Sequence, residues 1–532
     1  MMAAQPDLGE SHRGTLGMDG TAEPPGDDWG PFGRPLFDDP SARALSRVGV
    51  VDVGSNSVRM VVFDGAARSP AYFYNEKIMC GLGAGLAESG RLNPLGRVRA
   101  LAALRRFALL AEGMGIPPLT VVATAAVREA SDGADFRDEV LRETGLRLFV
   151  ITGDEEARLS AQGVLLGWPE AAGLVCDIGG SSMELAVIGN GTVGKRKTSP
   201  LGPFRLQQVT GGAVGLDRHI TGILNGLKAE LGGNHDRIYL VGGSWRAIAR
   251  LDMERKSYPL TVLHEYRMSA RSVIETVNWI EKTDLTALRL RTGTSLERME
   301  LVPLACEVLR HLVRVFKPKE IDISSYGIRE GMLYEQMPER LRRRDPLIEA
   351  CRFAELSAAR IPGFGKKLFE FLTPLFRAAP PQRLRLIKAA CLLHDTTWRA
   401  HPDYRAEACF DNATRANLGG LDHPGRVFLG LALLHRYKNS RAGSRMEPLF
   451  KLLTAAEIAD AEVLGKAMRF GAMLSVDAPE AAAELRYFPK KRVLELVLRA
   501  DKQGLYGEVA QARFASLAAS LKVETKVRVA RK

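Results

Sequence analysis

The stretch VVDVGSNSVRMVVFD, residues 50–64, decides how the N-terminal part of this chain is built. One apolar run ends near Asp52, the chain turns through Gly54-Ser55-Asn56-Ser57, and a second apolar run starts at Val58. This pattern predicts a strand, a tight turn and a returning strand. Gly54 lets the backbone approach a ligand closely. The polar residues after it offer successive hydroxyl, amide and main-chain N–H donors, which together can surround an anion.

A second stretch, VCDIGGSSMELAVIGNG at residues 175–191, superposes on the first without gaps. Asp177 then matches Asp52, Gly179 matches Gly54, and the serine that ends each turn is also shared. Internal repetition of this kind is a sign of duplicated architecture. We therefore expect two lobes of similar build, each presenting an anion-binding hairpin toward a shared cleft. The aspartate beside each turn suits a divalent cation that bridges protein and phosphate through hard oxygen ligands.

Length and composition indicate the general class of protein in which these motifs lie. The 532 residues are enough for roughly three or four domains of about 150 residues each. With 46% hydrophobic and 26% charged residues, the chain has the composition of an ordinary globular protein. The formal net charge of +12 favours polyanionic partners, although charge alone does not choose among nucleic acid, nucleotides, polyphosphate and acidic membrane.

Targeting signals and cysteine pairs give little further information. The six cysteines are scattered without any CxxC pair, so neither a zinc site nor a disulfide framework is indicated, and a reducing cytoplasm fits best. Residues 1–46 are rich in Gly, Pro and Asp and lack the apolar core of a signal peptide, which predicts a disordered N-terminal extension. No run approaches the roughly 20 apolar residues of a membrane span, so we expect a soluble protein with no membrane partner.

Two further segments place charged residues after predicted strands. Residues 119–123 form an apolar run followed by Arg128, and ligands of open α/β sheets lie beyond the carboxyl ends of strands. Arg128 therefore either reaches an anion or is an exposed arginine at a helix start. In TGDEEARL, Thr152 and Glu155 match a capping box. The residues favour that capping role, while the alternative is that a glutamate projects into the cleft and activates water as a general base.

The second half-repeat continues with a basic segment and a glycine-rich turn. Lys195, Arg196 and Lys197 form a predicted basic tip, which is either a solvated turn or a guide for a long polyanion. Gly242-Gly243-Ser244 follows the predicted strand 237–241 and opens a helix. That turn either faces a nucleotide or allows close packing.

Six motifs now stand in order along residues 48–336: DVGSNSVR, TAAVREA, TGDEEARL, DIGGSSMEL, VGGSWRAIA and YGIREGML. In this order and at these separations they resemble the Ppx/GppA family of exopolyphosphatases and guanosine pentaphosphate phosphohydrolases. The resemblance implies an α/β fold of two duplicated ribonuclease-H-like lobes, as in the actin and sugar kinase superfamily. We place lobe I at residues 47–172, lobe II at 173–340, and an all-α, HD-like C-terminal domain at 341–532.

The resemblance also implies roles for individual residues. Glu156 becomes the catalytic base, Asp52 and Asp177 match cation-associated positions with magnesium as the expected ion, and Glu184 is a lesser metal candidate. Ser181 stands where many members have a third glycine, a change that removes no N–H donor. The implied phosphate-binding residues are Gly54, Ser55, Asn56, Ser57, Arg59, Arg128, Gly179, Gly180, Ser181 and Ser182.

The C-terminal region, residues 341–532, has helical periodicity throughout and few strand signals. His394-Asp395 follows an apolar helix, but a metal-dependent HD site needs an upstream histidine, and none lies between Asp345 and Leu393. We therefore favour a hydrogen-bonded structural pair over a metal site. The basic end, residues 521–532, is either a frayed tail or a polyanion contact.

These observations predict an exopolyphosphatase that releases orthophosphate from the end of inorganic polyphosphate. Guanosine pentaphosphate is a second candidate substrate. The resemblance implies a homodimer, and nucleic acid is not an expected partner. A non-catalytic polyphosphate-binding or nucleotide-binding regulator is the alternative from another class, and a kinase of the sugar or acetate type is a weaker third.

Overall fold

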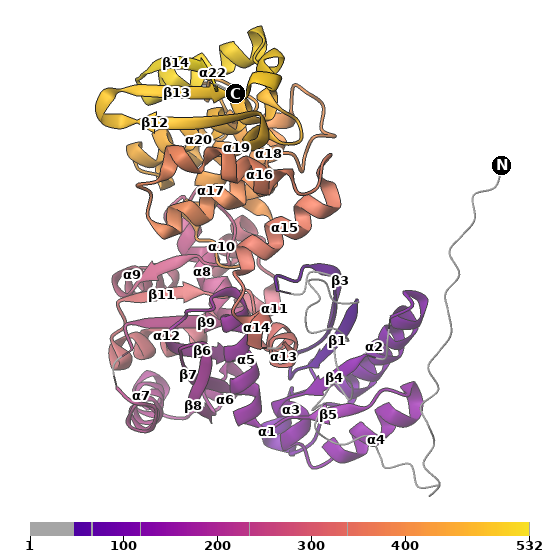
Figure 1. The fold of residues 1–532 in the computed structure, drawn as a ribbon. Coiled ribbons are helices and arrows are strands. Elements are labelled where there is room, and N and C mark those ends of the chain that lie inside the picture. Colours follow the sequence, from indigo (N-terminus) through magenta and orange to yellow (C-terminus); the bar gives the residue numbers. More distant parts are fainter. Residues whose placement is uncertain (1–46, 65–67, 117–118, 234, 338, 531–532) are drawn as a thin grey trace, which may run out of the picture.

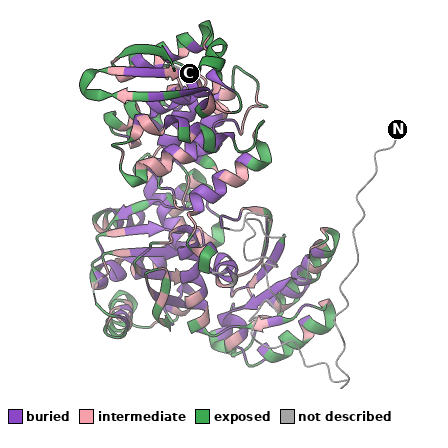
Figure 2. Ribbon diagram, viewed as in Figure 1, coloured by how far each residue is buried: buried purple, intermediate pink, exposed green. Residues whose placement is uncertain are grey.

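The computed structural model describes residues 47–64, 68–116, 119–233, 235–337 and 339–530, so the predicted extension over residues 1–46 lies outside the described residues. Two α/β lobes lie side by side, and a C-terminal body rests on the second of them (Figure 1). Buried residues concentrate in the sheets and in the helices between them, while the outer helix faces are exposed (Figure 2).

Lobe I is built on a five-stranded sheet with the order β3-β2-β1-β4-β5. The first three strands are antiparallel neighbours, and β4 and β5 run parallel to β1. Its strands are β1 (Val48–Val53), β2 (Ser57–Phe63), β3 (Tyr72–Met79), β4 (Thr120–Ala123) and β5 (Leu148–Val150).

Lobe II repeats this topology in the order β8-β7-β6-β9-β11, with β10 added at the β11 edge. The directions also match, because β6, β7 and β8 are antiparallel neighbours and β9 and β11 run parallel to β6. The duplication predicted from the two hairpin sequences is thus confirmed. The strands are β6 (Gly173–Ile178), β7 (Met183–Gly189), β8 (Thr192–Ser199), β9 (Arg237–Val241), β10 (Arg267–Ser269) and β11 (Glu320–Ile323).

Helices pack against the outer sides of both sheets with their apolar residues inward. In lobe I these are α1 (Leu86–Ser89), α2 (Pro94–Gly113), α3 (Ala125–Glu129) and α4 (Gly133–Thr144). In lobe II they are α6 (Pro203–Leu206), α7 (Gly212–Leu231), α8 (Gly243–Arg255), α9 (Ala270–Glu281), α10 (Leu285–Thr292), α11 (Leu296–Met299) and α12 (Val302–Phe316).

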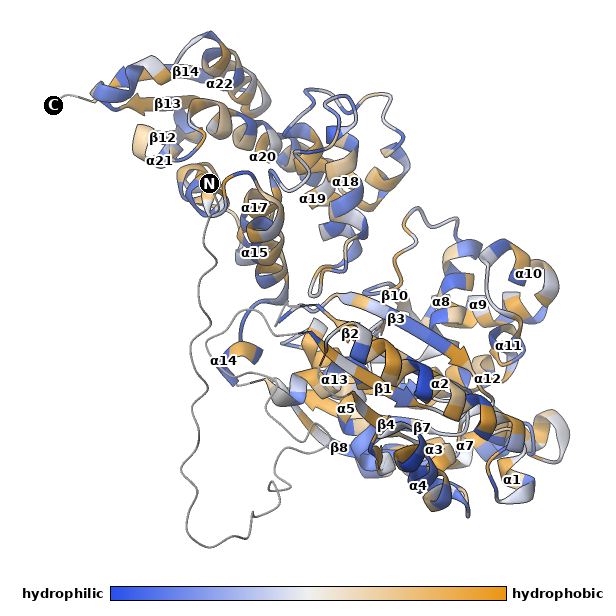
Figure 3. Cartoon of the chain, turned by 90° about the vertical axis from the view of Figure 1, so that its right-hand side faces the viewer, coloured by the Kyte–Doolittle hydropathy of each residue, from blue (hydrophilic) through white to orange (hydrophobic). Residues whose placement is uncertain are grey.

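Two helices lie between the sheets and join the lobes: α5 (Gly153–Gly167) and α13 (Ile328–Gln336) pack against each other (Figures 1 and 3). Helix α5 follows the strands of lobe I yet contacts β7 and β8 of lobe II, and α13 contacts β1 of lobe I. The helices approach so closely that a Cβ on Gly331 would lie 1.8 Å from the Leu159 carbonyl oxygen. Glycine is therefore required there, and the contact fixes the position of α5.

The C-terminal body has its own apolar core. Its helices are α14 (Glu339–Arg342), α15 (Pro346–Ala358), α16 (Phe364–Leu372), α17 (Pro381–Leu393), α18 (Arg405–Arg415), α19 (His423–His435), α20 (Ala455–Leu474), α21 (Pro479–Ala482) and α22 (Glu508–Leu521). Short 3₁₀ segments lie at Thr373–Phe376, Glu447–Leu452, Pro489–Lys491 and Ala500–Leu505.

The prediction that residues 341–532 are all-α is wrong. The body ends in a three-stranded sheet of β12 (Ala483–Phe488), β13 (Val493–Leu498) and β14 (Glu524–Val529). Every second residue of β13 from Leu494 onward is a buried leucine, a period of two that a short run easily hides among helices. Because β14 pairs in parallel with β13, residues 524–529 are not a frayed tail.

Candidate active site

The two predicted hairpins face each other across the cleft between the lobes. Their turns have the same hydrogen bond, from Gly54 N to Ser57 O at 3.0 Å in lobe I and from Gly179 N to Ser182 O at 2.9 Å in lobe II. They also touch, because the Ser181 hydroxyl donates to the Ser55 hydroxyl at 3.2 Å. The Ser181 side chain thus connects the loops of the two lobes.

Most of the predicted site residues line this cleft, together with Thr124, Ser244 and the Gly242-Gly243 turn. Arg128 and Glu184 lie outside the lining; Arg128 donates a hydrogen bond to Glu156, and Glu184 pairs with Asp177 across the β6–β7 hairpin. The predicted residues that line the cleft are Asp52, Gly54, Ser55, Asn56, Ser57, Arg59, Glu156, Asp177, Gly179, Gly180, Ser181 and Ser182.

The first turn of helix α5 contains both a capping box and a glutamate that faces the cleft, the two roles that its sequence suggested. Thr152 and Glu155 form a capping box, with Glu155 N donating to Thr152 Oγ1 at 3.2 Å and Thr152 N donating to Glu155 Oε2 at 2.8 Å. The next residue, Glu156, turns into the cleft and is only 7% exposed. The cap orients the helix, so the glutamate that follows it is held at a fixed place.

Arg128 holds the Glu156 carboxylate in position. Its Nη1 donates to Glu156 Oε2 at 3.3 Å and to the Ile151 carbonyl at 2.8 Å. Burial raises the pKa of Glu156 well above its ordinary value, and the neighbouring Glu184 carboxyl raises it further while Arg128 opposes both. A carboxylate with a raised pKa is a stronger base than a solvated one.

Glu184 lies behind the cleft, paired with Asp177 across the β6–β7 hairpin. Thr198 Oγ1 donates to Glu184 Oε1 at 2.9 Å, and the residue is 2% exposed. Burial, followed by the charge of Asp177, raises the pKa of Glu184 to about 8. This position does not suit the role of metal ligand at the cleft surface.

Asp52 and Asp177 occupy equivalent positions in the two lobes and both line the cleft. Arg329 Nη1 donates to Asp52 Oδ2 at 3.1 Å, and the Ser160 hydroxyl donates to Asp177. Burial raises the pKa of both carboxyls. Desolvated carboxylates of this kind are stabilised by a cation.

The carboxylates in the cleft can hold magnesium only if oxygen atoms of the substrate complete its coordination. Among the described residues, no group of three or more His, Cys, Asp and Glu side chains is placed to hold a metal ion. Magnesium, however, commonly uses one or two carboxylates together with substrate phosphates and water. Asp52 and Asp177 meet that requirement.

Four cationic residues in the cleft lining were not among the predicted site residues: Lys77, Arg246, Arg298 and Arg329. Burial, followed by the charges of Arg298, Arg59 and Arg246, lowers the pKa of Lys77 to about 8. Arg246 and Arg329 lie within motifs that the sequence analysis quoted without a role, whereas Lys77 lies on β3, a strand that was not predicted. The cleft is therefore far more cationic than its two loops suggested.

Comparison with known proteins agrees with this fold. A model of the Ppx/GppA phosphatase family matches residues 61–340, and a model described as exopolyphosphatase, C-terminal, matches residues 348–526. The chain is 27% identical over 315 residues to Exopolyphosphatase 1 of Mycobacterium leprae, covering 55% of this chain and 89% of that protein. It is 24% identical over 436 residues to Retrograde regulation protein 2 of Saccharomyces cerevisiae, covering 73% of this chain and 72% of that protein.

A crystal structure described as an exopolyphosphatase-like protein shares the fold of the two lobes. It is 23% identical with a TM-score of 0.50, and the match covers 54% of this chain and 97% of that one. No helix in the described part of the chain has the length and apolar character needed to cross a bilayer. Because the first family model covers 280 of the 532 residues, this chain belongs to the Ppx/GppA phosphatase family.

Proposed function

We propose that this phosphatase is an exopolyphosphatase that hydrolyses the terminal phosphoanhydride of inorganic polyphosphate and releases orthophosphate. The observation that carries the proposal is the combination of two oxyanion loops with cationic side chains from both lobes. Lys77 and Arg298 have no hydrogen bond or ion pair from their side chains to any described residue, although burial lowers the pKa of each. Desolvated cations without acidic partners favour a ligand that carries several negative charges.

In the proposed reaction, the main-chain N–H groups of the two hairpins hold the terminal phosphoryl group. Phosphoryl transfer has a loose transition state, so the site acts mainly by positioning groups and balancing charge. Arg59 and Arg329 offset charge on the oxygens of the transferring group. Glu156, held by Arg128, orients a water molecule in line with the breaking bond and takes its proton.

The cation that we propose is magnesium, held by Asp52 and Asp177. When bound, it supplies additional positive charge at the phosphate oxygens. In its absence Arg329 neutralises Asp52, and the Ser160 hydroxyl stabilises Asp177.

Guanosine pentaphosphate is the second substrate that we propose, because its terminal phosphoanhydride presents the same group to the hairpins. A regulator that binds polyphosphate without cleaving it is the competing function. The name of the yeast relative and the length of the match to it favour that alternative. The proposals of a cytoplasmic location and a homodimer are supported by the family resemblance alone.

One assay separates these functions. Purified protein with magnesium is supplied with long-chain polyphosphate, guanosine pentaphosphate or ATP, and phosphate release is followed over time. We expect steady release from polyphosphate. Binding of polyphosphate without release would support the regulator, and phosphate transfer from ATP to a sugar or acetate would support a kinase.

A further inference from the structure

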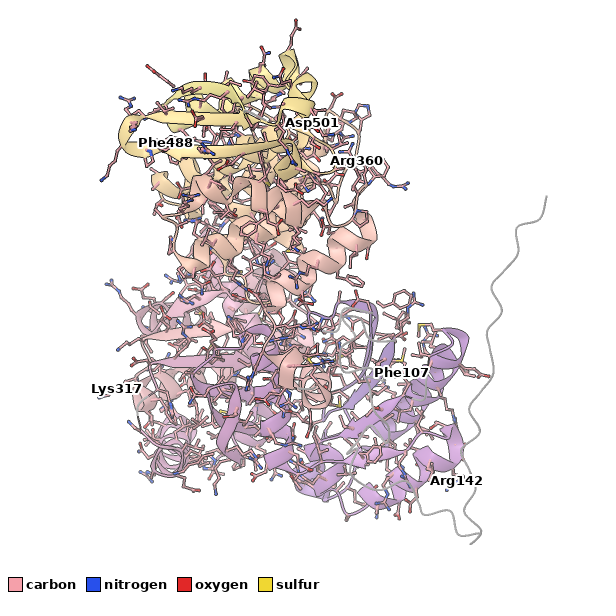
Figure 4. The ribbon with its side chains drawn as sticks, in the orientation of Figure 1. Phe107, Arg142, Lys317, Arg360, Phe488 and Asp501 are labelled. Atoms are coloured by element: carbon pink, nitrogen blue, oxygen red, sulfur yellow. The ribbon has the colours of Figure 1, made fainter. Side chains whose placement is uncertain are left out.

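Three arginines gather around His394-Asp395 in the C-terminal body, away from the cleft between the lobes. They are Arg360 after α15, Arg405 at the start of α18 and Arg436 at the end of α19. Figure 4 labels Arg360 in this body. The reaction proposed above uses none of them, so their role needs a separate explanation.

One guanidinium group occupies the carboxylate of Asp395. Arg360 Nε donates to Asp395 Oδ2 at 2.7 Å and its Nη2 donates to Oδ1 at 2.6 Å, so both carboxylate oxygens are occupied. His394 Nδ1 lies 2.9 Å from the Cys391 carbonyl oxygen. This bidentate ion pair neutralises the Asp395 carboxylate.

Arg436 is the residue that this arrangement leaves unsatisfied. It is 4% exposed, its Nε has no hydrogen-bond partner, and its guanidinium forms no hydrogen bond or ion pair with any described residue. The guanidinium carbon lies 4.8 Å from the centroid of the Tyr437 ring. A buried guanidinium with free donors is costly unless an anion pairs with it.

The surroundings of Arg436 add positive charge. The guanidinium of Arg405 lies 5.6 Å from the centroid of the same Tyr437 ring and donates only to the Ala400 carbonyl oxygen, at 3.2 and 3.4 Å. Asp395 is the carboxylate that acts most strongly on Arg436, and Arg360 already neutralises it. Burial and the charges of Arg513 and Arg436 lower the pKa of Arg469 nearby. Around Arg436, the N–H donors of the arginines therefore outnumber the hydrogen-bond acceptors.

We propose that Arg436, with Arg405 and Arg360 beside it, forms a second oxyanion site for a phosphate group. The planar fork of a guanidinium matches two oxygens of a phosphate, and several arginines together suit a doubly charged tetrahedral anion. Two sources supply this chemistry. One is free inorganic phosphate, and the other is a distal phosphate unit of a polyphosphate chain whose end lies in the cleft.

The binding test uses the full chain and radiolabelled inorganic phosphate in equilibrium dialysis, so it does not depend on hydrolysis. Wild-type protein is expected to bind two phosphates per chain, one in the cleft and one at Arg436. Arg436→Gln is expected to lose one site, and Arg405→Gln is expected to weaken the same site at least about fivefold. The matched control is Arg445→Gln, an exposed arginine of the same body paired with Glu407 and Asp411.

Arg405→Gln keeps the test valid if loss of the buried Arg436 unfolds the body, because Arg405 is half-buried and bonds only a loop carbonyl. One phosphate per wild-type chain, or equal binding by wild type and Arg405→Gln, would overturn the proposal.

A second arm measures KM for long-chain polyphosphate and for triphosphate. A rise of about tenfold in the KM of Arg405→Gln for long chains alone identifies the distal chain as the ligand, while unchanged KM with weakened phosphate binding identifies free phosphate.

Discussion

The hairpins of lobe I and lobe II share a backbone turn but differ in the charge that their returning strands carry. Arg59 pairs with Asp52 across the first hairpin, and Glu184 pairs with Asp177 at the equivalent place in the second. Asp52 is thus surrounded by cations from both lobes, Arg59 and Lys77 of lobe I and Arg329 of lobe II. Asp177 has a second buried carboxyl beside it, Glu184, and accepts its hydrogen bond from the neutral Ser160, while the charges of Arg246 and Arg329 act on it from further away.

This difference shows how two copies of one hairpin can contribute differently charged side chains to the same site. The repeated turns offer equivalent N–H donors, so we propose that both bind the phosphoryl group. Cations come from both lobes, with Arg59 and Lys77 from lobe I and Arg246, Arg298 and Arg329 from lobe II. On the lobe II side, Glu184 lies behind Asp177 and acts electrostatically on Glu156.

The largest expected effect comes from removing the base. Glu156→Gln is expected to lower kcat on long-chain polyphosphate by at least about a hundredfold and to leave KM within about threefold, because proton transfer is lost while the anion loops remain. The neighbouring Glu155→Gln is the control, since glutamine also completes a capping box. Phosphate release at the wild-type rate by Glu156→Gln would remove this residue from the mechanism.

On the lobe I side, Arg59→Gln is expected to raise KM for polyphosphate by at least about tenfold with a smaller change in kcat, because a charge-assisted hydrogen bond of about 1.5–3 kcal/mol is lost in binding. Steady-state kinetics with polyphosphate measure both KM and kcat of the variant. Arg142→Gln, an exposed substitution at the outer edge of the same lobe (Figure 4), should change neither constant. A fall in kcat as large as that of Glu156→Gln would contradict a role of Arg59 mainly in binding.

The buried acid of lobe II predicts a dependence of stability on pH. Because burial raises the pKa of Glu184 from 4.5 to about 8, the folded state holds its proton more tightly than the unfolded state. Its stabilising contribution is present below pH 4.5 and is lost as the pH rises through 8. The free energy of unfolding of metal-free protein should therefore decline less from pH 5 to pH 9 in Glu184→Gln than in wild type.

Urea unfolding at several pH values measures this difference. Glu230→Gln serves as the control, because that carboxylate is more than half exposed and pairs with Lys197 on the surface. Parallel pH profiles for wild type and Glu184→Gln would show that the carboxyl is ionised in the folded state.

The smallest expected effect concerns the cap of α5. Thr152→Ala should lower the free energy of unfolding by about 1 kcal/mol, as loss of a helix cap typically does. Thr454→Ala removes an equivalent capping box from α20 and should cost a similar amount. Only Thr152→Ala should also lower kcat, by a few fold, because Glu156 lies one residue beyond the capping box. Equal kcat for the two variants would mean that the cap does not position Glu156.

The sequence predicted those parts of the site that are local in the chain. Asp52 and its loop were predictable because a strand, turn and strand of about fifteen residues contain their own signals, and the second hairpin repeated them. Glu156 needed the family resemblance, since its residues alone favoured a cap. Lys77 and Arg298 come from segments far apart in the chain that only the packed lobes bring together.

Elements with weak or short signals were the ones missed. Strand β8 was predicted as a basic tip, yet it pairs with β7 along the sheet edge. The strands of the C-terminal sheet are six residues each and lie among long helices, so a helical period dominated that region. The ion pair of Arg360 with Asp395 had no local signal, because Arg360 lies 35 residues before Asp395.

The central claim is that both hairpins hold one terminal phosphoryl group with Glu156 beside it. A crystal structure of Glu156→Gln grown with magnesium and triphosphate tests this most directly. We predict that the terminal phosphate accepts hydrogen bonds from main-chain N–H groups of both loops, near Ser55 and near Ser181, with the side chain at residue 156 facing its phosphorus. A triphosphate bound to the loop of one lobe alone, or outside the cleft, would contradict the account.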